Sequence, residues 1–234
     1  MLLDALFRPD SFFRKRAPRP SLGGAFAVVL VISLVTTVAL GAIGWQMSRG
    51  MMATGVDNPN RPPDWVCEER TGTDVGFHGC DRPRKVPLGD VMWDLVGKTL
   101  PFVFVAPFLV WIASAIVLHA LSAFGGGEGS FGNTVSITAW GMLPSLFQTA
   151  VGFGLLYLTL RDAELGGSPE AVAEQLRLLV SKIRGGSLLL SAVASLWHWY
   201  IWTYGLKHAR NLSTEAAGTS VGVVAFLVFL FGAV

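Results

Sequence analysis

The sequence predicts an all-α membrane protein: a bundle of five transmembrane helices with an N-terminal interfacial segment and a disulfide-bearing outer loop. The first observation is composition, because 52% of the 234 residues are hydrophobic and 15% are charged, whereas about 25% of residues are charged in soluble domains. The second is the distribution of charge. Five stretches contain no Asp, Glu, Lys or Arg: 20–48, 99–127, 129–160, 185–206 and 216–234. Each can cross a bilayer, since about 20 apolar residues span roughly 30 Å and one central charge costs about 2.5 to 3.5 kcal/mol.

The charge-free stretches define the predicted spans. We expect spans near 24–46, 100–122, 135–159, 186–206 and 215–234, all within a five-helix domain at 23–234 that follows a basic amphipathic tail at 1–22. A cleaved signal peptide is the alternative for the first span. Its apolar run at 25–45 is longer than the about 7 to 15 apolar residues of signal peptides, which favours a retained helix.

The N-terminal tail is apolar on one side and basic overall. Leu2, Leu3, Leu6 and Phe7 share one side of a short helix, and Phe12 and Phe13 follow a break at Pro9, so we expect this segment on the membrane surface. Its basic residues are Arg8, Arg14, Lys15, Arg16 and Arg19. They favour a cytoplasmic N-terminus, which puts loops 47–99 and 160–185 outside, loops 123–134 and 207–214 inside, and the C-terminus outside.

The two cysteines of the chain, Cys67 and Cys80, lie in the same predicted outer loop, 47–99. A disulfide persists only in an oxidising compartment, so a Cys67–Cys80 pair agrees with an outside location. Two alternatives stay open. The cysteines could be free thiols, or they could bind a metal with His78, although a structural zinc would then lack one ligand.

Residues 168–184 form a further amphipathic pattern between the third and fourth spans. Ser168 suits an N-cap position and Pro169 the first helical turn. The apolar residues on one face are Val172, Leu176, Leu179, Val180 and Ile183. We expect an outer amphipathic helix that lies flat at the interface or caps the bundle.

A G-x-G-x-x-G pattern occurs at Gly127, Gly129 and Gly132. A dinucleotide site needs a strand before this pattern and an acidic residue about 20 positions after it. The preceding segment is too long and apolar for one strand, and no Asp or Glu occurs between Glu128 and Asp162. With no H-E-x-x-H or G-x-S-x-G motif either, we expect no catalytic, cofactor-binding or metal-binding residues, no nucleic-acid partner and no enzyme.

Few polar side chains interrupt the predicted spans. His119, Gln148 and His198 could line a small transporter or channel. Each is explained more simply as one hydrogen bond between helices, worth about 0.6 to 2 kcal/mol. The aromatic residues Trp197, Trp199, Tyr200, Trp202 and Tyr204 are expected to form an interfacial belt.

The predicted inner face carries the candidate partner-binding residues. A glycine-rich turn lies beside mixed charge, as expected for an exposed and adaptable docking loop. The candidates are Gly125, Gly126, Glu128, Gly129, Ser130, Phe131, Lys207, His208 and Arg210.

Three segments carry a resemblance to a known family: LFRPDSFFRKRAPRPSL, HALSAFGGGEGSFGNTVSITAWGMLPSLF and WTYGLKHARNLSTEAA. The second contains Gly126, Gly129, Ser130, Phe131 and Pro144. Together they resemble Yip1-domain membrane proteins of the prokaryotic, particularly haloarchaeal, kind. The resemblance implies five transmembrane helices, a cytosolic N-terminus and a short outer C-terminus. For eukaryotic relatives it implies a role in membrane traffic through contact with lipid-anchored small GTPases of the Rab type and with other membrane proteins.

The function expected from the sequence is a non-catalytic integral membrane scaffold or adaptor in the cell membrane. It would bind a cytosolic, small-GTPase-like or membrane partner through its inner face and organise membrane or vesicle processes, alone or as a homo-oligomer. The alternative is a small transporter or channel that uses His119, Gln148 and His198.

Overall fold

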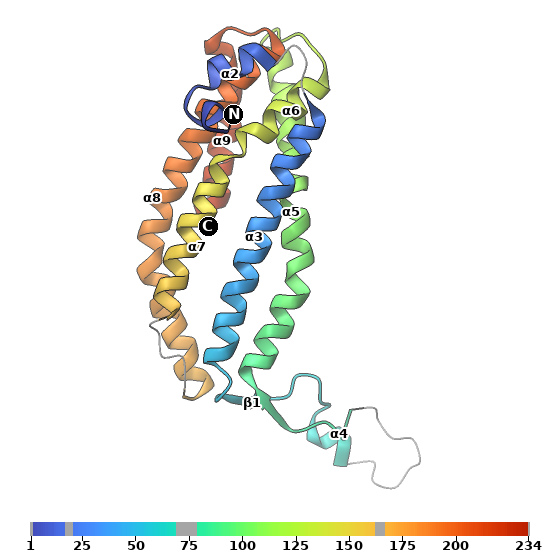
Figure 1. Ribbon diagram of the computed structural model, residues 1–234. Helices are drawn as coiled ribbons and strands as arrows, with labels where there is room; N and C mark the ends of the chain where they lie inside the picture. Colours follow the sequence, from blue (N-terminus) through green and yellow to red (C-terminus); the bar gives the residue numbers. More distant parts are fainter. Residues whose placement is uncertain (1, 17–20, 69–78, 162–166, 234) are drawn as a thin grey trace.

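The computed structural model describes residues 2–16, 21–68, 79–161 and 167–233 (Figure 1). His78 and Val234 lie outside the described residues. The elements in chain order are α1 (Leu2–Phe7), α2 (Pro9–Arg16), α3 (Leu22–Gly50), β1 (Gly55–Asp57), α4 (Asp64–Glu68), β2 (Lys85–Pro87), α5 (Leu88–Phe124), α6 (Phe131–Gly141), α7 (Pro144–Arg161), α8 (Pro169–Arg210) and α9 (Thr214–Ala233).

The predicted all-helical membrane class is confirmed. Among the described residues, three helical segments are long and apolar enough to cross a membrane: α3 with 29 residues, α5 with 37 and the unit Phe131–Arg161 with 31. At about 1.5 Å per residue, each exceeds the roughly 30 Å of a hydrocarbon core. A shorter apolar helix covers Thr214–Leu227. The count of five spans stays a prediction.

Helix α8 differs from the sequence prediction. We expected a separate amphipathic helix at 168–184 and a span at 186–206, but one helix of 42 residues covers both. It begins as predicted, because the Ser168 side chain accepts a hydrogen bond from the Ala171 amide and Pro169 follows. It then continues through Gly185 and Gly186 because each glycine costs a helix only about 1 kcal/mol relative to alanine.

The first turns of α8 pack inside the bundle instead of lying flat at an interface. Val172 is buried in a cluster with Ile43, Met51 and Leu160, and Leu176 packs against the same cluster. Val172, Leu176 and Leu179 of the predicted apolar face therefore pack against residues of α3 and α7.

Two further boundaries differ from the predicted spans. Helix α5 begins at Leu88, inside the predicted loop 47–99, directly after an antiparallel ribbon in which Val56 pairs with Val86. The span expected at 135–159 consists of two helices, α6 and α7. The break comes before Pro144, which has no amide hydrogen to continue the ladder of the preceding helix.

The N-terminal tail packs on the bundle, whereas the sequence placed all of it on the membrane surface. Phe12 and Phe13 are buried in the main hydrophobic cluster, while Leu2, Leu3 and Phe7 are exposed. Phe13 fits beside Gly205 of α8, where an added Cβ would lie 3.4 Å from its ring. The missing side chain at Gly205 thus provides the space that the tail fills.

The two ends of the bundle carry different accessory structures (Figure 1). One end, called the tail end below, holds α1, α2, α6, the glycine loop at 125–130 and the turn at 211–213. The opposite end, called the ribbon end, holds β1, β2 and α4. Near α4, the disulfide predicted between Cys67 and Cys80 is present, with 5.8 Å between the two Cα atoms.

Candidate partner-binding site at the tail end

The glycine loop is held by the buried side chain of Arg210 at the end of α8. Its Nε donates to Ser122 Oγ at 3.0 Å, one terminal nitrogen donates to the Gly127 carbonyl at 2.7 Å, and the other donates to the Gly129 carbonyl. In return, the Glu128 amide donates to the Arg210 carbonyl at 2.8 Å. The loop expected to be adaptable is therefore fixed to α8.

The close approach of the loop to α8 requires glycine at position 129. Gly129 has φ +114°, and an added Cβ would lie 2.8 Å from the Ala209 carbonyl oxygen. Side chains rarely adopt this backbone conformation. The pattern that resembled a phosphate-binding loop thus follows a helix, α5, and supports packing between segments of the chain.

Three side chains point outward from the fixed loop and its flanks. Phe124, the last residue of α5, is 90% exposed, Phe131 at the start of α6 is 42% exposed, and Glu128 is also exposed. Leaving a large apolar side chain in water is less favourable than burying it, by about 1.5 to 3 kcal/mol. A protein or lipid surface that covers Phe124 and Phe131 would gain this free energy of burial.

The remaining predicted residues form a second cluster, with the tail. His208 Nε2 lies 2.8 Å from Asp10 Oδ1 of α2, and Lys207 Nζ lies 3.6 Å from the same oxygen. The hydrogen bond with His208 lowers the pKa of Asp10 below its usual value, and the charges of His208, Lys207 and Arg14 act in the same direction. Lys207 and His208 therefore hold α2 against α8.

The candidate set therefore divides into residues that hold the tail end together, namely Lys207, His208 and Arg210, and residues that are exposed on the loop and its flank. Arg210 is buried and its guanidinium is engaged inside the chain, so it positions the loop and is not itself exposed to a partner. Gly125, Gly126, Glu128, Gly129, Ser130 and Phe131 are exposed on the loop and its flank.

Sequence reasoning missed Ser122, Asp10 and Phe124. Phe124 stands at the end of a charge-free run, where exposed and lipid-covered aromatic residues look alike in sequence. Asp10 and His208 are 198 positions apart, and no local pattern links such a pair. Only the opposite charges of Asp10 and Lys207 could have suggested it.

Of the polar residues proposed for transport, His119 and Gln148 have separate hydrogen-bond partners, whereas the buried Nδ1 of His198 has none among the described residues. His119 Nδ1 lies 3.0 Å from Thr134 Oγ1, which joins α5 to α6. Gln148 Nε2 donates to Ser191 Oγ at 3.2 Å, which joins α7 to α8. His198 is buried with its ring 5.5 Å from that of Trp202. In the described part of the chain, no hydrogen bond, ion pair or ring contact joins any two of these three residues.

The sequence predicted that the aromatic residues of α8 form an interfacial belt, but two of them pack against other segments of the chain. Trp202 is buried, and its Nε1 donates to the Thr138 carbonyl at 2.9 Å. Trp197 Nε1 donates to the Leu6 carbonyl at 3.0 Å. These bonds join α8 to α6 and to the tail.

No group of three or more His, Cys, Asp or Glu side chains that could hold a metal occurs among the residues that the structure describes. Cys67 and Cys80 are joined to each other, so neither sulfur is available as the thiolate ligand considered from the sequence.

Comparison with known protein families matches residues 3–234 to the Yip1 domain. An uncharacterized protein of Methanocaldococcus jannaschii is 23% identical over 157 residues, which cover 67% of this chain and 88% of that protein. No solved structure matches the chain. The family match includes the tail, the glycine loop and the end of α8, which together build the tail end.

Proposed function

The chain belongs to the Yip1 family of membrane proteins, and from this premise we propose that it is a non-catalytic integral membrane adaptor that binds a protein partner through its tail end. The family is generally non-enzymatic. The partner is a cytosolic protein of the small-GTPase kind or another membrane protein, and the complex organises membrane or vesicle processes.

The observation that carries the proposal is the fixed glycine loop with Phe124 exposed beside it. Arg210 donates to two loop carbonyls and to Ser122 of α5, so little conformational entropy of the loop remains to be lost when a partner binds. Exposed aromatic side chains are enriched among the residues that dominate binding energies. Phe124 and Phe131 supply such side chains at opposite ends of the loop.

We further propose five spans, with the tail end in the cytoplasm and the C-terminus outside. The exposed basic residues Arg8, Arg14 and Lys15 support this orientation. The disulfide supports it independently, because it belongs to the ribbon end, opposite the tail (Figure 1), and disulfides persist in oxidising compartments.

Crosslinking in native membranes tests the adaptor proposal. A photoreactive amino acid is placed at position 124 or 130, and matched control chains carry it at position 102, where the native Phe102 is exposed on α5. We expect discrete protein adducts from positions 124 and 130 that are absent from position 102. Phe124→Ala should lower the adduct yield from position 130 severalfold, since this variant removes an exposed aromatic ring and leaves the Arg210 contacts in place.

The same protein adducts from all three positions, or none from the tail end, would count against the adaptor. Orientation has its own test. A membrane-impermeant thiol reagent should label Cys67 and Cys80 on intact cells only after reduction, and labelling that requires lysis would invert the proposed topology.

A further inference from the structure

A groove runs between α8 and α9 with two chemically different halves. The first half is a cavity of about 480 Å³ lined by Ala192, Ser195, Leu196, Trp199, Gly222, Ala225, Phe226 and Phe229. The second, of about 470 Å³, is lined by Trp199, Tyr200, Thr203, Tyr204, Thr214, Glu215, Gly218 and Thr219. Trp199 belongs to both halves. Each volume lies in the range of about 300 to 1,000 Å³ typical of small-molecule sites.

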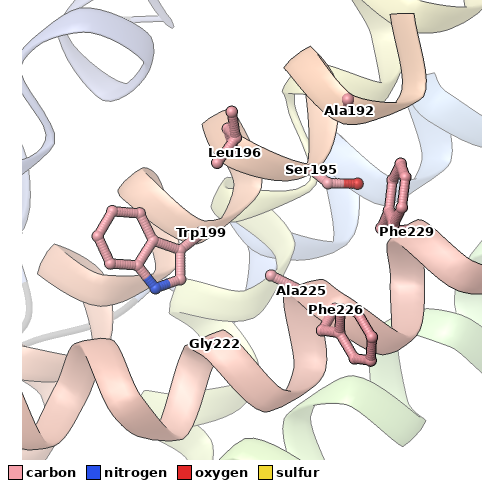
Figure 2. Close-up of a pocket in the computed structure, with 8 residues that line it drawn as sticks. All are labelled: Ala192, Ser195, Leu196, Trp199, Gly222, Ala225, Phe226 and Phe229. Carbon is pink, nitrogen blue, oxygen red and sulfur yellow. The ribbon is translucent and has the colours of Figure 1, made fainter. Parts of the chain in front are cut away.

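The groove follows from the spacing of small residues on both helices. Its apolar half uses positions i, i+3, i+4 and i+7 of each helix, which form one helical face. The small residues Ser195, Gly222 and Ala225 leave space between the larger Trp199 and Phe229 (Figure 2). Trp199 is fixed, because its Nε1 donates to the Gly218 carbonyl at 3.0 Å.

The apolar half suits a hydrocarbon ligand. The parts of α8 and α9 that line it belong to the charge-free stretches 185–206 and 216–234. Water finds few hydrogen-bond partners on such apolar walls, so hydrocarbon fills this open groove more favourably than water does. From Ala192 to Tyr204 the whole groove extends about 18 Å along α8 at about 1.5 Å per residue, which suits a long alkyl chain and its polar end.

The second half, called the polar half below, has walls that are still mostly apolar but adds hydrogen-bond acceptors and a negative charge. Thr203 Oγ1 already donates to the Trp199 carbonyl at 2.7 Å, and Thr219 Oγ1 donates to the Glu215 carbonyl at 3.0 Å. Each hydroxyl hydrogen is thus engaged within its own helix, so these oxygens can only accept from a ligand, and the Glu215 carboxylate accepts as well. The ammonium of Lys207, near the Tyr204 ring, is already within 3.6 Å of Asp10.

We propose that this groove binds a membrane lipid whose head group carries an ammonium. One hydrocarbon chain lies in the apolar half beside Phe226 and Phe229, and the ammonium donates to Glu215 at the tail end. The two halves lie in the order in which such a lipid carries its hydrocarbon chain and its head group. Glu215 directly precedes the charge-free stretch 216–234, so it lies at the boundary where charged residues begin. The proposal goes beyond the adaptor function and rests only on α8 and α9 lying in the bilayer.

Photolabelling of the full chain in phosphatidylglycerol nanodiscs tests this lipid site. The probe is a phosphatidylethanolamine with a diazirine in one acyl chain, and the matched probe is the same lipid N-acetylated, which removes the ammonium. We expect adducts from the first probe to concentrate on peptides that contain Trp199 and Phe226. Glu215→Gln should reduce the preference for the amine probe about tenfold, the scale of a lost charge-assisted hydrogen bond.

Variants that fill the groove complete the test. Gly222→Leu and, from the opposite wall, Ser195→Leu should each reduce labelling severalfold. The matched control is Gly154→Leu in α7, because an added Cβ there meets nothing within 4 Å. An unchanged elution profile and melting temperature identify the variants that still fold.

Equal labelling by both probes, adducts spread evenly over all lipid-facing helices, or labelling unaffected by both Gly222→Leu and Ser195→Leu would overturn the lipid site. Crosslinks from the groove to a second copy of the chain would overturn it in favour of self-association. These outcomes remain separate from the adaptor proposal, since protein adducts from position 130 can persist when lipid adducts are lost.

Discussion

At the tail end, buried residues from the N-terminal tail and from α3, α5, α6, α8 and α9 share one hydrophobic cluster, whereas the buried cluster nearer the ribbon end consists of Ile43, Met51, Leu160 and Val172. The polar contacts differ in the same way. At the tail end, Arg210 reaches the glycine loop and Trp202 reaches α6. At the ribbon end, a disulfide and a short ribbon join segments that are close in sequence.

The tail end is therefore held by contacts between distant segments, whereas the loop at the ribbon end is held by a disulfide and a short ribbon. The tail end depends on many side chains that interlock across the chain, so single substitutions should affect the whole bundle. Around the disulfide and the ribbon the links are between segments closer in sequence, so changes there should stay local, whereas Thr54 and the buried cluster at the same end join α3 to α7 and to the start of α8.

Gly141→Ala should destabilise the whole bundle most strongly. An added Cβ would lie 1.8 Å from Trp202 Cδ1, and Trp202 is buried and bonded to Thr138. We expect a loss of about 3 kcal/mol in unfolding free energy, the upper part of the range for overpacked cores, measured by thermal unfolding in detergent. Gly154→Ala, which has open space at its Cβ, should leave the melting temperature unchanged. Equal melting temperatures for the two variants would contradict the interlocked tail end.

Arg210→Ala should release the glycine loop. Removing the guanidinium leaves Ser122 and the Gly127 carbonyl without their donor, which costs about 2 to 3 kcal/mol. Faster hydrogen exchange of the Gly127 and Glu128 amides would report it. Arg210→Lys should restore only part of the protection, because one ammonium lacks the planar fork of donors. Arg14→Ala, an exposed arginine of α2, is the matched control, and loop protection that survives Arg210→Ala would refute this role.

Removing the disulfide should leave the tail end nearly unchanged. In the double variant Cys67→Ser/Cys80→Ser, we expect faster proteolysis within 58–86, since the chain segment between the cysteines is no longer closed. Because sub-regions can open separately, the melting temperature of the bundle should shift by the equivalent of less than about 1 kcal/mol. A larger shift would show that the two ends are energetically coupled.

Lowering the pH should weaken the contact of the tail with α8 by the smallest amount. The pKa of Asp10 is lowered in the folded protein, so its contribution is complete above the usual carboxyl pKa of about 3.9. It is lost as the pH falls through the lowered folded value. Since Asp10 is partly exposed, Asp10→Asn should cost only about 0.2 to 1 kcal/mol.

Exchange of the α2 amides with pH provides the measurement for Asp10. Protection in the wild type should fall below about pH 4 towards that of Asp10→Asn. An Asp10→Asn variant with wild-type protection at neutral pH would remove this carboxylate from the contact.

Local features of the sequence were sufficient for several elements. The charge-free stretches predicted the helices α3 and α5, and Ser168 with Pro169 predicted where α8 begins. The presence of two cysteines in the chain, both in one loop, favoured the Cys67–Cys80 pair, which the structure contains. The end of the amphipathic segment at 168–184 could not be predicted in the same way, because neither a proline nor a capping residue stops the helix before Asn211, whose φ of 54° ends it.

The candidate site was less accessible to sequence reasoning. The glycine loop was recognised, but it is held by Arg210, which the sequence presented as one of several charged candidates for partner binding. Phe13 looked like a surface anchor until Gly205 and Ile137 provided a place for its ring. In each case the decisive neighbour lies far along the chain.

By itself, the sequence determined which segments prefer hydrocarbon and where the oxidised cysteines lie. These are local properties, because burying charge in hydrocarbon is costly wherever it occurs along about 20 consecutive residues. Only the tertiary structure decided that Arg210 fixes the loop, that Phe13 belongs to the core and that α8 and α9 enclose a two-part groove. Those outcomes depend on shape and on paired polar groups brought together from distant positions, which no single segment specifies.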